Sequence, residues 1–536
     1  MTTTTPQRPR ASLLEVPEIV DVRPPRWFDR LPRWASTAAV LIALLAISAF
    51  IRTRTLSGEL WFDEAGAVGL ASHSLGSLLG AVHRAGAAPL YYVLLHIWMS
   101  MFGSSEASTH GLSLLLGLAC VPAAMWTAWS VAGRRAGIFA AVLFAFSSFL
   151  TRYAEETQPY ALMVLLALLA TAGLLHAFVY RRRRYLWLFG ACLALMLYTQ
   201  GAALLYWVGA AAALVVVWRG LQDQRDRFLR DALICFGAAA VLFLPWLPTA
   251  IDQIAHATNP WHYTPLQGAT IPSQLLGSER VDVTLLVCVL IGVAPLCLRA
   301  RRRTPDAAMF WALIVIPAAA LAVGRILGFF IPIWAWRYFG PIVAPLLLLG
   351  ALSAARARVV GVVAIIFCVA FLANAGSFAP PYKSNMKGVA AEVTPYLHPG
   401  DLVVVSQPEQ AALAWYYLPS NLRYATTLGP ARDPSVTNWM GALGRLRGAA
   451  PGTTLAPLVA SLKPGQQLLY VRPLTEGAKN WSGAWAALVR RRSAQWGQLL
   501  QDDRARGTLT PVATAPHNYR SACCVASSAV LYRKAS

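Results

Sequence analysis

The stretch ALMVLLALLATAGLL, residues 161–175, decides the fold, because none of its fifteen side chains carries a charge. Similar uncharged runs occupy residues 35–50 and 359–373, and others lie between them. Apolar segments of this kind that recur along a chain are typical of helices that cross a membrane, where every backbone polar group must be paired within the structure. The first 375 residues therefore predict a polytopic α-helical membrane protein.

The composition agrees with this prediction. Of the 536 residues, 57% are hydrophobic and 13% are charged. A disordered chain lacks such apolar content, and an ordinary soluble domain carries about 25% charged residues. The formal net charge of +22 would suggest nucleic-acid binding if the protein were soluble. The positions of the basic residues along this chain indicate a different role.

Arginine clusters separate pairs of apolar segments, and they lie at residues 134–135, 181–184, 219–230, 299–303 and 356–358. If each cluster is cytoplasmic, as the positive-inside rule expects, the clusters fix which segments cross the plasma membrane and on which side each connecting loop lies. The cytoplasmic segments then hold 22 of the 46 basic residues, so the charge orients the chain and predicts no nucleic-acid partner. Eleven spans are expected, at residues 35–51, 108–131, 136–151, 160–180, 185–199, 202–218, 232–249, 283–298, 307–323, 338–354 and 359–375.

This topology places the N-terminus in the cytoplasm and the C-terminus outside. Residues 1–34 are rich in Thr, Pro and Arg, and we expect a disordered cytoplasmic arm. The apolar stretch at residues 89–102 is too short for a span and has the length of an interfacial or re-entrant helix. Residues 52–108 are therefore expected to form one large outer loop with helices along the membrane surface, within a transmembrane domain of residues 35–375.

From residue 376 onward the pattern is that of a soluble domain. Short buried strands are predicted at residues 401–406, 467–472 and 528–533, and helices at residues 411–417 and 484–500. About 160 residues is a usual domain size. The sequence thus predicts a C-terminal extracytoplasmic α/β domain over residues 376–536.

Acidic and basic side chains gather in the outer loops of the membrane part. Asp63 and Glu64 follow closely on the first span, and Arg152, Glu155 and Glu156 lie in the short second outer loop. A solvated loop would explain either group alone. Charges at the membrane surface are costly unless they are solvated, paired or functional, and two such groups at one face predict a polar site at the lipid boundary.

Arg337 adds a cation at the outer end of the tenth span. A carboxylate can take the proton from an attacking hydroxyl, and the fork of a guanidinium suits the oxygens of a departing phosphate. The arrangement favours transfer from a lipid phosphate. The sequence has no CxxC, HExxH, GxGxxG or Walker pattern, so metal-thiolate, zincin and nucleotide-binding sites have no support.

Several motifs occur in an order that is typical of one superfamily. They are WFDEA at residues 61–65, PLYYVLLHIW at 89–98, FGSSE at 102–106, RYAEETQPY at 152–160, RY at 337–338, and residues 383–387 leading to PGDLVVV at 399–405. In this combination the membrane part resembles the GT-C glycosyltransferases, in particular the branch with protein O-mannosyltransferases and the lipid A aminoarabinose transferase. The resemblance implies a GT-C-like fold and a polyprenyl-phosphate-linked sugar, a hexose such as mannose or a pentose, as donor. It also implies an inverting single displacement at the outer face, with a lipid, glycan or protein as acceptor.

The resemblance also implies roles for individual residues. Asp63 corresponds to the catalytic base, Glu64 would shape the acceptor site beside it, and Glu156 would be the acid of the second loop. Arg337 is the candidate for binding the donor phosphate, together with Arg152. Further candidate contacts to donor or acceptor are Glu155, Gln158, Tyr160, Tyr338 and His83. Some members bind a divalent cation near such acids and others need none, so the cofactor is left open.

The chain departs from the family pattern at two places. The surface helix usually begins His-Pro-Pro, where this chain has Ala87, Ala88 and Pro89, and the second loop usually has an arginine where this chain has Gln158. These changes leave donor, acceptor and metal dependence open. A transporter or lipid export component without transferase activity stays an alternative, although the spans lack the central acid that transport would favour. An accessory protein whose outer domain binds a partner is a third.

Overall fold

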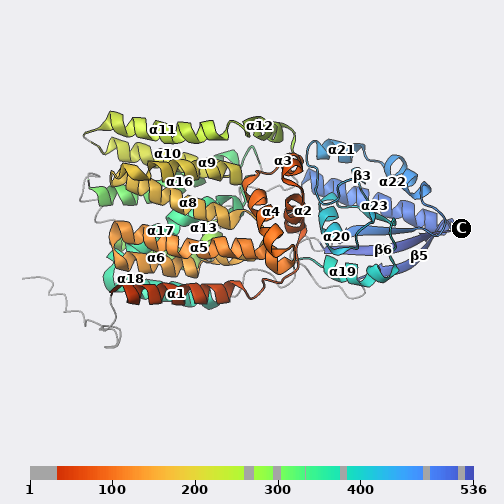
Figure 1. The fold of residues 1–536 in the computed structure, drawn as a ribbon, viewed down its shortest axis with the longest axis horizontal. Coiled ribbons are helices and arrows are strands. Elements are labelled where there is room, and N and C mark those ends of the chain that lie inside the picture. The colour runs from red at the N-terminus through yellow and green to blue at the C-terminus, as the bar shows by residue number, and fades with distance from the viewer. Residues whose placement is uncertain are drawn as a thin grey trace, which may run out of the picture.

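The computed structural model describes residues 33–221, 223–258, 271–293, 304–331, 333–374, 383–474, 483–516 and 526–535. A bundle of helices occupies one end of the molecule and a sheet flanked by helices occupies the other (Figure 1). Three short helices lie between them: α2 (Phe62–Ala71), α3 (Leu75–Arg84) and α4 (Leu90–Phe102). All but the last two residues of the predicted N-terminal arm, the basic cluster at 299–303 and the expected boundary near residue 376 lie outside the described residues.

The helices of the bundle account for most of the first 374 residues. They are α1 (Arg33–Arg52), α5 (Glu106–Ala132), α6 (Arg134–Ala145), α7 (Ser148–Ala154), α8 (Tyr160–Leu174) with its continuation η2 (Leu175–Val179), η3 (Arg183–Tyr185), α9 (Leu186–Thr199), α10 (Ala203–Arg219), α11 (Arg225–Phe243), α12 (Leu247–His256), α13 (Ile271–Leu276), α14 (Glu279–Gly292), α16 (Pro305–Leu327), η5 (Trp336–Ile342), α17 (Val343–Arg356) and α18 (Arg358–Asn374).

Each of the eleven ranges predicted to span the membrane contains helix. Among the described residues, five helices are long and apolar enough to cross a membrane by themselves. The number rises to seven if α6 with α7 and α11 with α12, which are bent by 49° and 74°, each form one span. The prediction of a multi-pass helical membrane protein is confirmed, whereas the count of eleven spans stays a prediction.

The core of the bundle surrounds α8. In the most apolar 18 residues of Tyr160–Val179, 89% are buried, whereas the share is only 22% in Trp34–Arg52 at the edge. A helix that is hydrophobic on all sides is stable in the interior of a bundle. The outer helices expose large apolar side chains such as Leu233 and Val241 of α11 and Leu286 of α14. Such faces are suited to contact with lipid.

The helix expected at residues 89–102 is present as α4, and its place at the membrane surface stays a prediction. Its neighbour α2 forms for local reasons. The Trp61 backbone N–H donates to Glu64 Oε2 over 3.2 Å and so closes the first turn, as in a capping box. Asp63 and Glu64 both lie in this first turn, where the helix dipole favours negative charge.

The C-terminal part contains a six-stranded sheet. The strands are β1 (Leu402–Val405), β2 (Arg423–Thr426), β3 (Gly429–Ala431), β4 (Gln467–Leu474), β5 (Leu509–Ala515) and β6 (Ala526–Lys534), in the order β3-β2-β1-β4-β6-β5. β1 runs parallel to β2 and β4, and the other neighbours are antiparallel. Around the sheet lie α19 (Met386–Val393), η6 (Thr394–Tyr396), η7 (Pro408–Gln410), α20 (Ala411–Tyr417), α21 (Ala442–Gly448), α22 (Pro451–Ala460) and α23 (Ala484–Ala505). The three predicted strands and two predicted helices are confirmed.

Both faces of the sheet are covered, which explains why all of β1 is apolar. Val403 and Val405 belong to the cluster that faces the membrane part, and Leu402 and Val404 belong to the cluster on the opposite face. The first cluster also includes Phe62 and neighbouring apolar residues of α2. The helix that carries Asp63 therefore shares a hydrophobic core with the sheet domain.

Candidate active site

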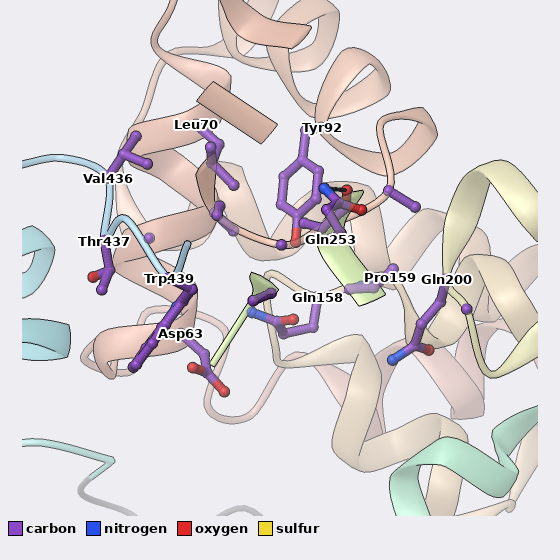
Figure 2. A pocket seen from close by; sticks show the side chains of 18 of the residues that line it. Asp63, Leu70, Tyr92, Gln158, Pro159, Gln200, Gln253, Val436, Thr437 and Trp439 are labelled. Atoms are coloured by element: carbon purple, nitrogen blue, oxygen red, sulfur yellow. Dashed lines mark hydrogen bonds between the residues drawn. The ribbon is translucent and has the colours of Figure 1, made fainter. Parts of the chain in front are cut away.

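A cavity of about 460 Å³ lies where the bundle, the surface helices and the sheet domain meet. Five of the residues predicted for the site line it: Asp63, Gln158, Tyr160, Arg337 and Tyr338. They come from α2, the second outer loop and η5, which are far apart in sequence. The tertiary structure therefore brings the predicted base and one predicted phosphate ligand to the same cavity. Figure 2 shows Asp63, Gln158 and Tyr92 projecting into it.

Asp63 is only partly exposed, and its exposed surface faces this cavity. Burial raises the pKa of its carboxyl from 3.8 to about 6. Arg337 acts in the opposite direction and lowers the pKa, while the charge on Glu64 raises it. A carboxylate with a pKa near 6 is ionised at neutral pH and still binds a proton readily, which suits a general base.

Glu64 does not line the cavity. It is fully buried and accepts hydrogen bonds from Lys383 Nζ at 2.8 and 3.0 Å and from the Thr157 backbone N–H at 2.9 Å. His110 Nε2 lies 2.8 Å from its Oε1. Burial alone would raise the pKa of Glu64, but Lys383 and His110 lower it well below its usual value. The structure thus places Glu64 in an ion-paired network that joins α2, α5, the second outer loop and the start of the sheet domain.

Arg152 and Glu156 are also separate from the cavity of Asp63. They form an ion pair over 3.4 Å, and the Arg152 guanidinium lies 4.7 Å from the centre of the Trp336 ring. Arg152 and Trp336 line a second cavity of about 370 Å³, together with Gln274 and its neighbours. The two predicted phosphate ligands therefore line different cavities: Arg337 lines the cavity of Asp63, and Arg152 lines the second cavity. The two cavities are close together, because Trp336 of the second cavity is the residue before Arg337 in η5.

Glu155 and His83, predicted as further contacts, do not line the cavity of Asp63 either. Glu155 is buried, which raises its pKa, and its Oε1 accepts a hydrogen bond from the Thr55 backbone N–H over 3.4 Å. His83 Nε2 lies 2.6 Å from Asp252 Oδ2 on α12, and the two residues join α3 to α12. Their positions indicate that both hold outer segments together.

The departure from the His-Pro-Pro pattern is located at the cavity itself. Ala87 and Ala88, the two residues that differ from this pattern, both line the cavity. Among the described residues, no group of three or more His, Cys, Asp or Glu side chains is arranged to hold a metal ion.

The structure adds residues that the sequence reasoning missed. Glu409, Val436, Thr437 and Trp439 of the sheet domain line the same cavity as Asp63. In Figure 2 the last three enter from the segment that follows β3. Glu409 precedes a short apolar helix in the sequence and resembles an ordinary acid at a helix start, so no pattern marked it. Trp439 lies in a loop without a motif.

The sheet domain is held in place by contacts near these residues. Asp433 Oδ2 accepts a hydrogen bond from Arg84 Nη2 over 2.9 Å and lies 3.1 Å from His73 Nε2. The Trp439 backbone N–H donates to the Arg84 carbonyl oxygen over 2.8 Å. The Thr258 N–H donates to the Trp439 carbonyl oxygen over 2.9 Å. The loop that closes the cavity is therefore bonded to both α3 and the end of α12.

Comparison with known proteins yields matches at the level of structure. No known family profile and no curated protein sequence matches the chain. Among solved structures, ArnT from Cupriavidus metallidurans bound to undecaprenyl phosphate aligns with a TM-score of 0.59 at 13% identity, over 93% of this chain and 97% of that one. Its apo structure aligns with a TM-score of 0.56 at 14% identity, over 82% and 93%.

An oligosaccharyltransferase from Archaeoglobus fulgidus, in complex with Zn and sulfate, aligns with a TM-score of 0.52 at 14% identity. The alignment covers 84% of this chain and 70% of that one. Both proteins are GT-C glycosyltransferases. The membrane part of the chain therefore has a GT-C-like fold, and a sheet flanked by helices follows it. The count of eleven spans and the position of the sheet outside the membrane stay predictions.

Proposed function

We propose that this chain is a membrane glycosyltransferase that moves a sugar from a polyprenyl-phosphate donor to a lipid, glycan or protein acceptor. The observation that carries the proposal is that Asp63 and Arg337 line one cavity at the end of the bundle, in a chain with the GT-C fold. A base and a phosphate-binding cation are the two groups that transfer from a lipid phosphate needs.

In the proposed reaction, the acceptor hydroxyl attacks the anomeric carbon of the donor sugar and loses its proton to Asp63. The bond between the anomeric carbon and the phosphate oxygen breaks, and the electron pair leaves with the polyprenyl phosphate. Arg337 balances the charge that develops on that phosphate. A single displacement of this kind inverts the anomeric configuration. Glu64 takes the role of a positioning residue, because it anchors the first turn of α2 beside Asp63.

Undecaprenyl phosphate is the ligand of one similar structure, and it supports the choice of a lipid phosphate here. We further propose that the cavity and the sheet domain lie on the outer side of the plasma membrane, with eleven spans and a cytoplasmic N-terminus. The positive-inside rule supports this orientation, because the basic clusters within the described part of the chain, at 134–135, 181–184, 219–230 and 356–358, lie at the ends of the bundle helices away from the sheet domain. The similar structures lend no support to the transporter alternative.

The test is transfer by the full-length protein, purified into lipid nanodiscs. Undecaprenyl phosphates carrying radiolabelled hexoses and pentoses serve as donors, and the lipid, glycan and protein fractions of a cell envelope serve as acceptors. We expect label to enter one fraction, with release of undecaprenyl phosphate. Asp63→Asn should reduce the rate about 100-fold or more, the range of general-base catalysis. Glu59→Gln, in the same loop but outside the cavity lining, is the matched control.

Two outcomes would contradict different parts of the proposal. Wild-type protein that transfers no label from any donor would contradict the assigned activity. Near-normal transfer by the Asp63→Asn protein would leave the activity standing and remove Asp63 from the mechanism.

A further inference from the structure

The sheet domain contributes a buried carboxylate to the cavity of Asp63. Glu409, in η7, is only 4% exposed and lines that cavity. Its Oε1 accepts hydrogen bonds from Gln407 Nε2 at 2.9 Å and from Trp485 Nε1 at 3.2 Å. Its Oε2 has no hydrogen-bond partner among the residues that the structure describes.

An unsatisfied buried carboxylate oxygen is costly and requires an explanation. Burial raises the pKa of Glu409, and the nearby charge of Asp63 raises it further, which places the two carboxyl groups in one electrostatic environment. Gln407 and Trp485, which donate to Oε1, are uncharged and do not offset this cost. Glu409 lines the cavity, so a ligand there is the available source of a hydrogen-bond donor for its carboxylate, and such a donor would offset part of the cost.

An aromatic ring in the wall of the same cavity is linked to this carboxylate through Trp485. Trp439 lines the cavity, and its ring centre is 5.1 Å from that of Trp485, in an edge-to-face arrangement. Trp485 thus supports the Trp439 ring and holds Glu409 Oε1 at the same time. The backbone of Trp439 is bonded on both sides, to Arg84 and Thr258. Glu409 and Trp439 are therefore positioned before any ligand arrives (Figure 2 shows Trp439 and Asp63 in the cavity wall).

We propose that Glu409 and Trp439 form the recognition site for the transferred sugar. Oε2 of Glu409 accepts a hydrogen bond from a hydroxyl of the sugar ring, and the apolar face of the ring packs on Trp439. A carboxylate with an adjacent aromatic ring matches a sugar, which presents hydroxyl donors at its edge and C–H groups on its faces. This inference rests on the proposed function, since the sugar that reacts must lie between Asp63 and Arg337, which line the same cavity.

The proposal assigns the sheet domain a part in substrate recognition. It differs from the view of that domain as a separate partner-binding module, because two of its residues form part of the wall of the cavity in which the proposed reaction takes place.

The test measures binding to the full-length protein in nanodiscs, with two probes: undecaprenyl phosphate alone and undecaprenyl phosphate carrying the sugar that the wild-type protein prefers. We expect the sugar to strengthen wild-type binding. Glu409→Gln keeps an oxygen that accepts from Gln407 and Trp485 but replaces the second oxygen with a donor. This variant should bind the sugar-bearing probe about 10–100-fold more weakly, as expected for one hydrogen bond to a charged group, and undecaprenyl phosphate normally.

Asp502→Asn is the matched control, because it makes the same change from carboxylate to amide at an exposed residue of α23 outside the cavity lining. A merely structural role of Glu409 predicts that Glu409→Gln weakens the binding of both probes to the same extent. Trp439→Ala should also lose the preference for the sugar-bearing probe. If Glu409→Gln and Trp439→Ala bind both probes as the wild type does, the inference is wrong. Wild-type protein that binds neither probe would contradict the proposed function instead.

A donor that lacks one ring hydroxyl gives a second measurement. The wild-type protein should bind one deoxy donor of a series about 10–100-fold more weakly than the parent, and the Glu409→Gln protein should show no such difference at that position. Equal discrimination by both proteins would overturn the assignment of Glu409 to that hydroxyl.

Discussion

Lys383 Nζ donates to both carboxylate oxygens of Glu64, at 2.8 and 3.0 Å, across 319 residues of sequence. Glu64 is fully buried, and Lys383 is nearly so. The pair joins the first turn of α2 to the segment that enters the sheet domain. Removal of one member leaves a buried charge without its main partner, which typically costs 3–5 kcal/mol, whereas removal of both can be far milder.

Lys383→Met is therefore expected to destabilise the protein by about 3 kcal/mol. The apparent unfolding temperature in detergent, followed by tryptophan fluorescence, should fall by several degrees. The double variant Glu64→Gln/Lys383→Met should regain part of this loss, because no uncompensated carboxylate is left in the interior. A Lys383→Met protein as stable as the wild type would show that His110 and the Thr157 N–H suffice for Glu64.

The proposed base makes transfer dependent on pH. Asp63 acts in its ionised form, and its pKa is about 6 because of burial. We expect kcat/KM to rise tenfold per pH unit below about 6 and to level off above it. The measurement is initial transfer rates from pH 4.5 to 8 with donor below saturation. A profile that is flat through this range would assign the base to a different group.

The raised pKa of Asp63 also predicts how this residue affects the stability of the protein. The native carboxyl holds its proton more tightly than the unfolded one, whose pKa is 3.8, so the ionised form destabilises the native state above pH 6. Below pH 3.8 this effect is absent. Asp63→Asn should therefore raise the apparent unfolding temperature at pH 7.5 and leave it nearly unchanged near pH 4. A stability loss at pH 7.5 would show that Asp63 is a structural anchor.

Arg337 lowers the pKa of Asp63, so its removal should be visible in the pH profile. In an Arg337→Gln protein we expect a lower kcat/KM and an acid limb displaced to higher pH, because the cation that favours ionised Asp63 is gone. Arg325→Gln, which removes an arginine outside the cavity lining, is the control. A lower rate with an unmoved acid limb would mean that Arg337 and Asp63 act independently.

Gly69 allows the sheet domain to approach α2. A Cβ at this position would overlap the carbonyl oxygen of Ser435, which lies in the loop that carries Trp439. Gly69→Ala is therefore expected to displace that loop, to cost about 1–3 kcal/mol and to weaken transfer. Gly76→Ala, on the open side of α3, has no neighbour to meet and is the control. Limited proteolysis within residues 429–441 should be faster in the Gly69→Ala protein only, and equal rates would contradict this close approach.

Much of the fold could be predicted from local pattern. Uncharged runs predicted a helical membrane protein, the apolar stretch at residues 89–102 predicted a surface helix, and short β-branched segments predicted strands of the C-terminal sheet. These features depend on the periodicity and length of apolar segments, which neighbouring residues set by themselves. The number of spans was harder to predict, because several helices are bent or shorter than a membrane is thick.

The site was only partly predictable, because charge in a sequence does not show which cavity a side chain faces. Asp63 and Arg337 line one cavity as expected, but Glu64, one residue from Asp63, points into a buried ion-pair network. Arg152 lines a second cavity, although it too is an outer-loop arginine. In an α-helix, each residue is rotated by about 100° from the one before it. Side chains that are neighbours in sequence therefore point into different environments.

The sequence by itself determined that the chain is a helical membrane protein, its GT-C resemblance and the residue that we propose as the base, since each depends on local composition or a contiguous motif. Only the tertiary structure decided that the sheet domain closes the cavity and that Glu409 and Trp439 lie in its wall. These residues follow Asp63 by more than 340 positions, and no local pattern records such a distance. Their placement results from packing of the sheet domain on α2 and from backbone bonds between the loop of Trp439 and the outer segments of the bundle.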